Sequence, residues 1–326
     1  MPLGLCVVGC GDFARTFAQA MRMLPGEVRL FFASRDAKRA SEYAHAFNGA
    51  GSFGSYEEAA ADPDVEAMYI CTPHYLHRDH VAMAASAGKH ILVEKPIART
   101  PDEGRAIIDA AGAAGVTLMV AENYRFMAPA RRAKALIDDG VIGHLRLIQL
   151  QEEALFSPGR WRNHRDLNGG GVFIDGGIHK VDLLRYLAGT PDHIYALELP
   201  RSTPGLNAED GLVLVTRSAR GVVGVINHSW TNAQRAGPMW VSITGSQGRI
   251  YFEAGSSWLK HDDGRSERTI TLGEDHYGLA PMVKEFVDSI REGRAPEMSG
   301  AEGLEDLALV LKAYESVEAG RSLPLG

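Results

Sequence analysis

The stretch VVGCGDFA, residues 7–14, constrains the fold of this chain more than any other part of the sequence. It ends the apolar run LGLCVVG, which is typical of a buried strand, and it opens a segment with helical periodicity over residues 13–23. Gly9 allows a tight turn, Gly11 lets a ligand approach the backbone, and Ala14 lets helix and strand pack closely. A strand, a GxGxxA turn and a helix in this order predict a Rossmann unit that binds a dinucleotide phosphate at the helix N-terminus. A glycine-rich turn without a ligand is the alternative.

Short apolar runs and helical segments alternate through the first third of the chain. The runs VRLFFAS, VEAMYICT, HILVEKP and TLMVAE have the length of strands, and helical patterns such as residues 36–47, 78–87 and 102–113 separate them. Strands that alternate with helices predict a parallel sheet with helical crossovers. We therefore expect an α/β protein whose residues 1–122 form a Rossmann NAD(P)-binding domain.

The pattern changes after about residue 122. A helix near residues 129–138 precedes the run HLRLIQLQEEAL, the glycine-rich segment GGGVFIDGGIHKVDLL at residues 169–184, and a long helix near 176–187. The runs IYALEL, GLVLVTR, VVGVINHSW, WVSITG and RIYFE then follow one another with turn signals between them. Residues 123–326 are expected to form an α+β domain with a large, mostly antiparallel open sheet.

Composition and charge exclude several classes of protein. The net charge of −7 argues against a nucleic-acid partner, which favours a basic face. No apolar run is long enough to span a membrane, and the N-terminal residues lack the pattern of a secretory signal peptide. Cys6, Cys10 and Cys71 form no CxxC pair and are odd in number, so a disulfide framework is not expected. The expectation is a cytoplasmic protein with no nucleic-acid partner and no membrane contact.

The cofactor is expected to be NADP in preference to NAD. An NAD site usually has an acidic residue at the end of the second strand, where it binds the ribose 2′-hydroxyl. Here Ser34 and Arg35 stand at that position. Arg35, helped by Ser34 and by Lys38 or Arg39, is suited to hold a 2′-phosphate. A solvated basic helix start with Asp36 as its N-cap is the alternative.

Several motifs follow the glycine turn in a fixed order. They are CTPHYLH at residues 71–77, VEKP at 93–96, and GGGVFIDGGIHKVDLL. The set resembles the glucose–fructose oxidoreductase, inositol dehydrogenase and rhizopine-catabolism family (Gfo/Idh/MocA), over nearly the whole chain. The resemblance implies an NAD(P)-dependent dehydrogenase or reductase that acts on CH–OH groups of a sugar, polyol or cyclic diol. It also implies that residues 123–326 serve substrate binding and oligomerisation, with a homodimer or homotetramer that forms through the sheet of this second domain.

Residue by residue, the resemblance implies a catalytic set and extends the group of cofactor contacts. The catalytic residues are expected to be Lys95, Asp175 and His179, which also contact substrate together with Tyr124. Trp161 and Arg162 resemble a pair that reaches the cofactor in NADP-using members. The full group of expected cofactor contacts is Gly9, Cys10, Gly11, Asp12, Phe13, Ala14, Ser34, Arg35, Lys38, Arg39, Thr72, Pro73, His74, His77, Glu94, Lys95, Asn123, Trp161 and Arg162.

These residue types fit the chemistry of carbinol oxidation. A histidine with a pKa near neutrality is suited to remove the hydroxyl proton while hydride leaves the same carbon for nicotinamide C4. Asp175 and His179, four residues apart, share a face of a helix, and Asp182 and Tyr186 continue that polar face. Lys95 follows a parallel strand, where ligands bind in open α/β sheets, and its ammonium can stabilise an alkoxide. The neighbouring glycines would then let nicotinamide and substrate lie against the backbone.

Some of these residues could instead have a purely structural role. His179 could be a satisfied histidine at a domain interface, and Lys95 could be a surface lysine that caps a strand. His74, His77 and His80 have the spacing HxxHxxH, but no second cluster of cysteines or acids completes a metal site, so no metal is expected. Two other functions are a cofactor-bound regulator or sensor without turnover and a transient-redox enzyme acting on glycosides. A sensor would not need lysine, aspartate and histidine together.

Overall fold

The chain divides into two compact units by its internal contacts. The computed structural model describes residues 1–155, 159–231, 239–275 and 277–325. Unit 1 comprises Met1–Glu122 and Leu279–Glu305, and unit 2 comprises Asn123–Gly278 and Asp306–Gly326. This division differs from two consecutive domains, because helix α9 (Leu279–Glu292) packs against α1 (Asp12–Ala20). A segment far along the sequence thus completes the first unit.

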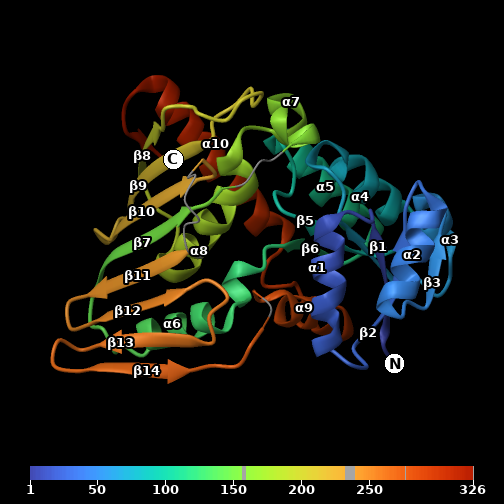
Figure 1. Ribbon diagram of the computed structural model, residues 1–326, viewed down its shortest axis with the longest axis horizontal. Coiled ribbons are helices and arrows are strands. Elements are labelled where there is room, and N and C mark those ends of the chain that lie inside the picture. The colour runs from blue at the N-terminus through green and yellow to red at the C-terminus, as the bar shows by residue number, and fades with distance from the viewer. Residues whose placement is uncertain (156–158, 232–238, 276, 326) are drawn as a thin grey trace. The chain divides into compact units, whose positions relative to one another are not determined.

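Unit 1 is built on a six-stranded parallel sheet in the order β3-β2-β1-β4-β5-β6 (Figure 1). The order reverses between β1 and β4, and in such sheets ligands bind at the carboxyl ends of the strands beside this point. The expected Rossmann fold is confirmed. The strands are β1 (Leu3–Val8), β2 (Val28–Ala33), β3 (Gly51–Phe53), β4 (Ala67–Ile70), β5 (His90–Glu94) and β6 (Leu118–Ala121). The other helices are η1 (Met21–Met23), α2 (Ala37–Phe47), α3 (Tyr56–Ala61), η2 (His74–Leu76), α4 (His77–Ser86) and α5 (Pro101–Ala114).

Local sequence explains where these elements begin and end. All six residues of β1 and all four of β4 are buried, as expected for central strands with helices on both faces. Side chains of Asp36, Ser55 and Thr100 cap α2, α3 and α5 by accepting a backbone N–H two or three residues into the helix. These caps define where the helices that follow β2, β3 and β5 begin.

Unit 2 contains a nine-stranded sheet in the order β14-β13-β12-β11-β7-β10-β9-β8-β15 across its described residues. Only the β7–β10 pair is parallel, so the expected mostly antiparallel open sheet is confirmed. The strands are β7 (Leu145–Glu153), β8 (His193–Glu198), β9 (Gly211–Arg217), β10 (Val223–Ser229), β11 (Trp240–Gly245), β12 (Arg249–Glu253), β13 (Trp258–Asp262), β14 (Glu267–Thr271) and β15 (Leu323–Pro324).

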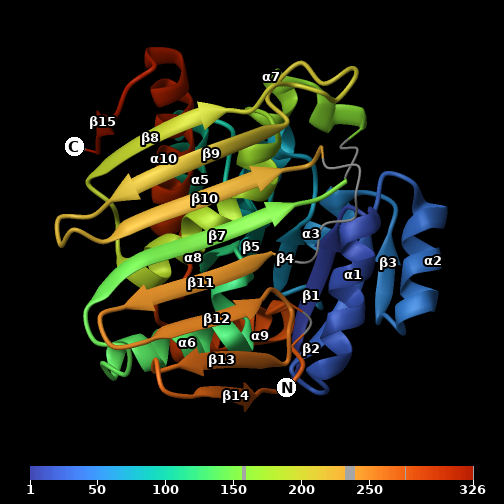
Figure 2. The ribbon, with the colours of Figure 1, turned by 60° about the vertical axis from the view of Figure 1, so that its left-hand side comes forward.

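Helices lie against one face of this sheet, as Figure 2 shows for α6, α8 and α10. These are α6 (Ala128–Asp138), α8 (Ile178–Ala188) and α10 (Gly300–Ala319), whose residues from Asp306 onward belong to unit 2. Shorter helices are η3 (Tyr124–Phe126), η4 (Arg160–Asn163), α7 (Arg165–Asn168) and the π-helix η5 (Phe173–Gly177). The segment expected to be one long helix near 176–187 is therefore a π-helix followed by an α-helix.

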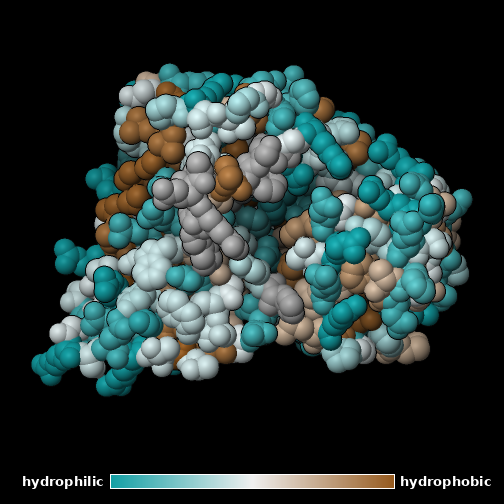
Figure 3. All heavy atoms as spheres, in the orientation of Figure 1, coloured by the Kyte–Doolittle hydropathy of each residue, from teal (hydrophilic) through white to brown (hydrophobic). Residues whose placement is uncertain are grey.

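The other face of the sheet carries exposed apolar side chains. Hydrophobic residues gather over β8, β9 and β10 in the space-filling view (Figure 3). Leu197 of β8 is 51% exposed and Val215 of β9 is 39% exposed. Within the described residues, no helix combines the length and the apolar character required to cross a lipid bilayer.

Candidate functional site

The glycine loop after β1 has the geometry of a phosphate-binding turn. Gly9 has a φ of 100°, and a Cβ there would lie 2.8 Å from the backbone oxygen of Cys71. Both facts require glycine at this position. A Cβ at Gly11 would meet no heavy atom within 4 Å, so space is open beside the backbone of the loop. The loop is anchored from α2 by Tyr43, whose hydroxyl donates to the carbonyl of Gly11 at 3.0 Å.

Helix α1 begins at this loop and has no side-chain cap. Gly11 is its N-cap residue and offers no side chain, so the first backbone N–H groups are available to an anion. Ala14 is fully buried, which agrees with its expected role in close packing, while Asp12 and Phe13 are exposed. The thiol of Cys10 points away to the carbonyl of Ala33, at 3.7 Å, and burial raises its pKa to about 11.

The end of β2 presents positive charge to solvent. Arg35, Lys38 and Arg39 are exposed, whereas Ser34 is buried and accepts the backbone N–H of Asp36 at 3.1 Å. The Asp36 carboxylate accepts the N–H of Arg39, so Asp36 is the N-cap of α2. An N-cap at this position was the alternative interpretation of this segment, in which the basic side chains are only solvated. An N-cap and exposed basic side chains coexist here, so helix capping and phosphate binding do not exclude each other.

The TPHYLH segment after β4 contains one histidine that is structural. His77 is fully buried, and its two ring nitrogens lie 3.0 Å from the Pro96 carbonyl and 2.9 Å from the Thr72 carbonyl. Burial lowers its pKa to about 4. A neutral ring donates through only one nitrogen, so one hydrogen bond, to Thr72 or to Pro96, holds His77 between the end of β4 and the VEKP turn. His77 therefore positions the two turns and does not offer a polar atom to a cofactor.

The other histidines of the HxxHxxH spacing have separate surroundings. His74 is 3% exposed and packs with its ring centroid 5.6 Å from that of His77. The Nδ1 atom of His80 lies 2.9 Å from the hydroxyl of Thr72, and its ring contacts Tyr56 edge-on at 4.9 Å. Among the residues that the structure describes, no group of three or more histidine, cysteine, aspartate or glutamate side chains is arranged to hold a metal ion.

The VEKP turn after β5 combines a buried acid with a partly exposed lysine. Tyr69 donates a hydrogen bond to Glu94, and both side chains are buried. Burial raises the pKa of Glu94 to about 7, and the charge of Lys95 opposes part of this shift. Lys95 itself is partly exposed at the carboxyl end of the sheet. The turn thus places an ammonium group and a carboxyl group that titrates near neutrality at the edge of unit 1 where ligands are expected.

In unit 2, Asp175 lies in the π-helix η5 and is almost fully buried. Its Oδ2 accepts a hydrogen bond from Nε of Arg162 at 2.7 Å. The guanidinium of Arg162 also stacks over the Trp161 ring, at 4.4 Å from the ring centroid. The expected cofactor pair Trp161 and Arg162 is therefore linked directly to an expected catalytic residue.

His179 is held next to Tyr124 by ring stacking. The two ring centroids are 4.1 Å apart and the planes differ by 10°, and both side chains remain partly exposed. Lys180, which is 1% exposed, places its ammonium 5.7 Å from the centroid of the same Tyr124 ring. Lys180 also binds the carboxylate of Glu152 and the carbonyl of Gly176. Three of the four expected substrate contacts, Tyr124, Asp175 and His179, thus lie in unit 2.

The glycines of the GGGVFIDGG segment are required for a different reason from the expected one. A Cβ at Gly171 would overlap Glu209, one at Gly170 would lie 2.5 Å from the Tyr314 hydroxyl, and one at Gly176 would lie 2.5 Å from the Trp230 ring. The protein's own side chains fill the space that a ligand was expected to use. The interpretation that these glycines admit nicotinamide and substrate is therefore wrong for these three positions.

One further expectation is corrected in unit 2. Asp182 was expected to extend the polar face of Asp175 and His179, but it is fully buried in an ion pair with Arg125 of η3. Tyr186 accepts a hydrogen bond from Arg131 at 3.2 Å. The Asp182–Arg125 pair joins α8 to η3, which brings Tyr124 beside His179.

Long-range contacts also shape the expected site. Asn123, an expected cofactor contact, donates its side-chain amide to the carbonyl of Tyr277 at 2.6 Å. His228, Glu209 and Tyr314 were not identified from the sequence. His228, fully buried, lies beside Gly176, and burial lowers its pKa well below the usual range. Glu209 and Tyr314 surround the start of η5. These contacts span up to 154 residues of sequence, and no local pattern signals them.

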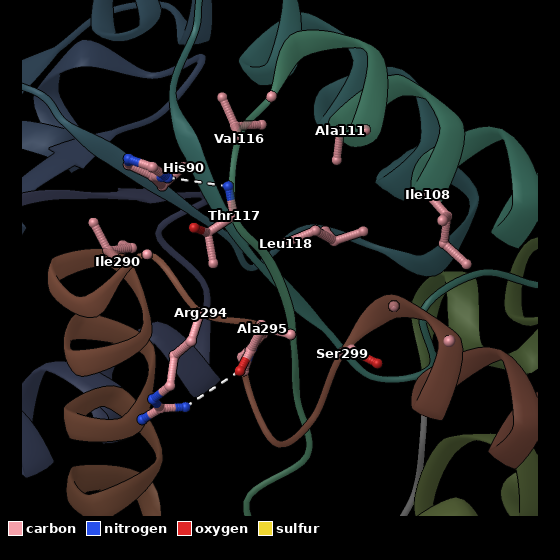
Figure 4. Close-up of a pocket in the computed structure, with 16 residues that line it drawn as sticks. His90, Ile108, Ala111, Val116, Thr117, Leu118, Ile290, Arg294, Ala295 and Ser299 are labelled. Atoms are coloured by element: carbon pink, nitrogen blue, oxygen red, sulfur yellow. Dashed lines mark hydrogen bonds between the residues drawn. The ribbon is translucent and has the colours of Figure 1, made fainter.

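Unit 1 also has an open groove at the other ends of the strands, with a volume of about 520 Å³ (Figure 4). His90 and Leu118, which begin β5 and β6, line it together with Arg294. The ring of His90 accepts the backbone N–H of Thr117, and Arg294 forms ion pairs with two glutamates. None of the residues expected from the sequence lines this groove. It is therefore separate from the candidate site.

Comparison with known proteins agrees with this geometry. Residues 3–122 match an oxidoreductase family with an NAD-binding Rossmann fold, and residues 130–251 match the Gfo/Idh/MocA C-terminal domain. The 1,5-anhydro-D-fructose reductase of Ensifer adhaerens is 30% identical over 97% of this chain and 96% of that protein. The levoglucosan dehydrogenase of Pseudarthrobacter phenanthrenivorans is 29% identical over 85% of this chain and 84% of that protein.

Solved structures are similar over the full length. Levoglucosan dehydrogenase in complex with NADH and L-sorbose has a TM-score of 0.89 and 25% identity over 99% of both chains. With two matched family regions, a relative of 30% identity and a shared fold, this chain belongs to the Gfo/Idh/MocA family of NAD(P)-dependent oxidoreductases.

Proposed function

We propose that the chain transfers hydride between a carbinol of a sugar, polyol or cyclic diol and a nicotinamide cofactor. The relatives named above carry names of enzymes that act on sugars or sugar derivatives, which supports this substrate class. The observation that carries the proposal is His179, which is partly exposed and fixed by stacking on Tyr124, with Asp175 in the preceding turn. A fixed, accessible imidazole is what a positioned general base requires.

The proposed roles follow from the bonds that change. When bound, the nicotinamide accepts the hydride that leaves the carbinol carbon with the electron pair of the C–H bond. His179 takes the proton of the hydroxyl group as the C=O bond forms, and returns it in the reverse direction. Lys95 is assigned to the substrate oxygen, where its ammonium would stabilise negative charge as the proton leaves. Asp175, held by Arg162, would orient the imidazole or a substrate hydroxyl.

Unit 1 has the features that a dinucleotide needs. The open space at Gly11 and the uncapped start of α1 fit a pyrophosphate. Exposed Arg35, Lys38 and Arg39 at the end of β2 fit a 2′-phosphate, which supports NADP as the preferred cofactor. Among the expected contacts, Thr72 lies just after β4 and Glu94 is the last residue of β5, at the same end of the sheet.

A panel of sugars and polyols, with each cofactor and absorbance of reduced nicotinamide as the signal, tests the reaction. For the best substrate, His179→Asn should lower turnover by about 10²–10⁴-fold, the range for a positioned proton carrier. Lys95→Met and Asp175→Asn should lower it as well, and His179→Asn should bind cofactor normally. His144→Asn, an exposed histidine in the same unit, is the matched control. Turnover near the wild-type value in His179→Asn would refute the assignment of the base.

Cofactor preference is tested separately by fluorescence titration. A charge-assisted hydrogen bond contributes about 1.5–3 kcal/mol, so Arg35→Ala should reduce the preference for NADPH over NADH by roughly ten- to a hundredfold. Arg105→Ala, an exposed arginine of α5, should leave the ratio unchanged. An unchanged ratio in Arg35→Ala would remove the basis for an NADP preference.

We also propose that the chain forms a homodimer or homotetramer through the sheet of unit 2. Exposed Leu197 and Val215 on neighbouring strands support this, because a large apolar patch on a soluble chain usually marks an interface. Leu197→Glu should reduce the mass measured by light scattering to that of a monomer. Val141→Glu, at an equally apolar exposed position outside the sheet, should not. A monomeric wild-type protein at micromolar concentration would exclude the proposal.

A further inference from the structure

We infer that Glu209 and Tyr314 are positioning residues for the reaction, because they form a two-residue cap that fixes the start of the helix carrying Asp175 and His179. The inference rests on the proposed function for its catalytic part. The cap itself is defined by contacts of the apoprotein. Neither residue belongs to the motifs that identify the family members' catalytic set, and both are remote in sequence from the helix they cap.

Four backbone N–H groups at the start of the segment are bound by these two side chains. Oε2 of Glu209 accepts the N–H of Val172 at 2.7 Å, and Oε1 accepts the N–H of Phe173 at 2.9 Å. The hydroxyl of Tyr314 accepts the N–H of Gly171 at 3.3 Å and that of Ile174 at 3.1 Å. The first N–H groups of a helix lack partners within the helix, so this cap satisfies several of them.

The two capping residues also bind each other. The Tyr314 hydroxyl donates to Oε1 of Glu209 at 2.6 Å, which aligns the carboxylate with the two N–H groups that it accepts. Glu209 is 5% exposed. A carboxylate at a helix N-terminus is also favoured by the helix dipole. The cap therefore has a defined geometry that is set from the segment before β9 and from α10, not from the helix itself.

The capped segment is the one whose geometry the reaction depends on. The π-helix η5 begins at Phe173, contains Asp175 and leads directly into α8, whose second residue is His179. A π-helical turn is uncommon and frequently occurs at functional sites. Such a turn persists only where its surroundings determine it. Release of the cap would therefore move Asp175 relative to Arg162, with which it now makes a 2.7 Å hydrogen bond.

The cap also gives the segment a dependence on pH. Burial raises the pKa of Glu209 to about 7, whereas the bonds from Tyr314, Phe173 and Val172 lower it. The charged groups that face it from neighbouring elements are Glu198 at the end of β8, which raises the pKa, and Arg201, whose own pKa is raised by Glu209. Because the pKa of Glu209 is higher in the folded segment than its ordinary value of 4.5, proton binding favours the folded segment. The capped segment should therefore lose stability as the pH rises from about 4.5 through 7.

Hydrogen exchange of the backbone amides of residues 171–174 tests the cap without any substrate. In Glu209→Gln the amide of Phe173 should exchange about tenfold faster or more, because a hydrogen bond to a charged group contributes at least that factor, whereas Val172 keeps its bond to the backbone carbonyl of Glu209 at 3.1 Å. In Tyr314→Phe the amides of Gly171 and Ile174 should exchange about two- to tenfold faster, because each loses a hydrogen bond to a neutral hydroxyl. In the wild type, exchange corrected for its intrinsic rate should become faster as the pH rises from about 4.5 through 7, and Glu209→Gln should not show this change. Unchanged exchange in both variants would overturn the inference.

Asp210→Asn provides a matched control. Asp210 is the neighbouring buried carboxylate, 1% exposed, and it accepts the backbone N–H groups of Ser202 and Thr203 at 2.7 Å. This variant should accelerate exchange at residues 202–203 and leave residues 171–174 unchanged. If Glu209→Gln does not fold, Tyr314→Phe still decides the question, because it removes two acceptor contacts and leaves the carboxylate in place.

The catalytic part is tested with the best substrate of the panel. Turnover by Glu209→Gln and Tyr314→Phe should fall by about 10–100-fold, the usual effect of a small misplacement of catalytic groups, with cofactor affinity unchanged. Faster exchange with wild-type turnover would overturn the positioning role. If the wild-type protein turns over no substrate of the panel, the proposed function fails, while the exchange data still support or overturn the cap.

Discussion

The substitution Gly171→Ala adds one methyl group just before the π-helix that carries Asp175. A Cβ at this position would overlap both the carboxylate and the backbone oxygen of Glu209. A rotation of the Glu209 side chain relieves only one of these overlaps, so the backbone near residue 209 or 171 must also move. The sequence alone suggested that this glycine makes room for a ligand. The structure predicts a loss of stability instead.

The size of the loss follows from the bonds that Glu209 makes. Displacing its carboxylate breaks the hydrogen bonds from Val172, Phe173 and Tyr314. At about 1.5–3 kcal/mol for each hydrogen bond to a charged group, the expected loss is about 5 kcal/mol or more. The free energy of unfolding of a whole domain is roughly 5–15 kcal/mol. Unit 2 of Gly171→Ala should therefore be marginally stable or unfolded.

Urea unfolding followed by tryptophan fluorescence measures this effect in the correct unit. All four tryptophans of the chain lie between residues 161 and 258, within unit 2. Gly273→Ala is the control, because a Cβ at Gly273 meets no heavy atom within 4 Å and its φ is not positive. This control should unfold as the wild type does or be stabilised by up to about 1 kcal/mol. If Gly171→Ala unfolded like the wild type and lost only ligand affinity, the packing argument would be refuted.

Two further predictions concern buried charges. Asp182→Asn removes the carboxylate that the buried Arg125 binds, and it should lower the free energy of unfolding of unit 2 by about 3–5 kcal/mol in the same urea assay. The control is Asp138→Asn, which breaks an exposed ion pair on α6. It should lower the free energy of unfolding by less than about 0.5 kcal/mol. In the folded protein the pKa of Glu94 is about 7, above its ordinary value of 4.5. Ionisation of Glu94 should therefore lower the free energy of unfolding of unit 1 by about 3 kcal/mol as the pH rises through this interval. Unfolding followed by circular dichroism at pH 5 and at pH 8 measures this decrease in the free energy of unfolding. In Glu94→Gln the decrease should be smaller by that amount, and a decrease identical to that of the wild type would contradict the raised pKa of Glu94.

Much of unit 1 was predictable, because its signals are local. The apolar runs that form β1, β2, β4, β5 and β6 are short, continuous and separated by helical patterns, and the glycine turn fixes where the first helix begins. The return of residues 279–305 was not predictable, because the contact of α9 with α1 joins segments that are far apart in sequence. Local periodicity gives no information on which unit a helix joins.

In unit 2, prediction succeeded for strands with a buried face and failed for the sheet edge. The strands β8 to β12 match apolar runs, since alternate residues are buried. The strand β14 (Glu267–Thr271) has the sequence ERTIT, and four of its five residues are exposed. A strand that buries almost nothing has no hydrophobic pattern by which it could be recognised.

The candidate site shows the same limit. Lys95, Asp175 and His179 were identified by motif, and the structure places Asp175 and His179 in one continuous helical segment. Their supports, Arg125 for α8 and Glu209 with Tyr314 for η5, were not identified, because each is a single polar residue whose partner is distant in sequence. Motifs report groups that meet the substrate, whereas the groups that hold them are visible only in three dimensions.

The two glycine-rich segments of this chain demonstrate how such motifs should be interpreted. In the sequence, GCG near residue 10 and GGG near residue 170 both suggest close approach of a ligand to the backbone. In the structure, space beside Gly11 is open, whereas the space beside Gly170 and Gly171 is filled by Tyr314 and Glu209. A glycine that faces open space can admit a ligand, and one that faces a fixed side chain serves the packing of the protein. The first segment therefore supports cofactor binding directly. The second acts on the proposed site indirectly, because its glycines let two buried side chains reach the backbone and hold the helix of Asp175 and His179.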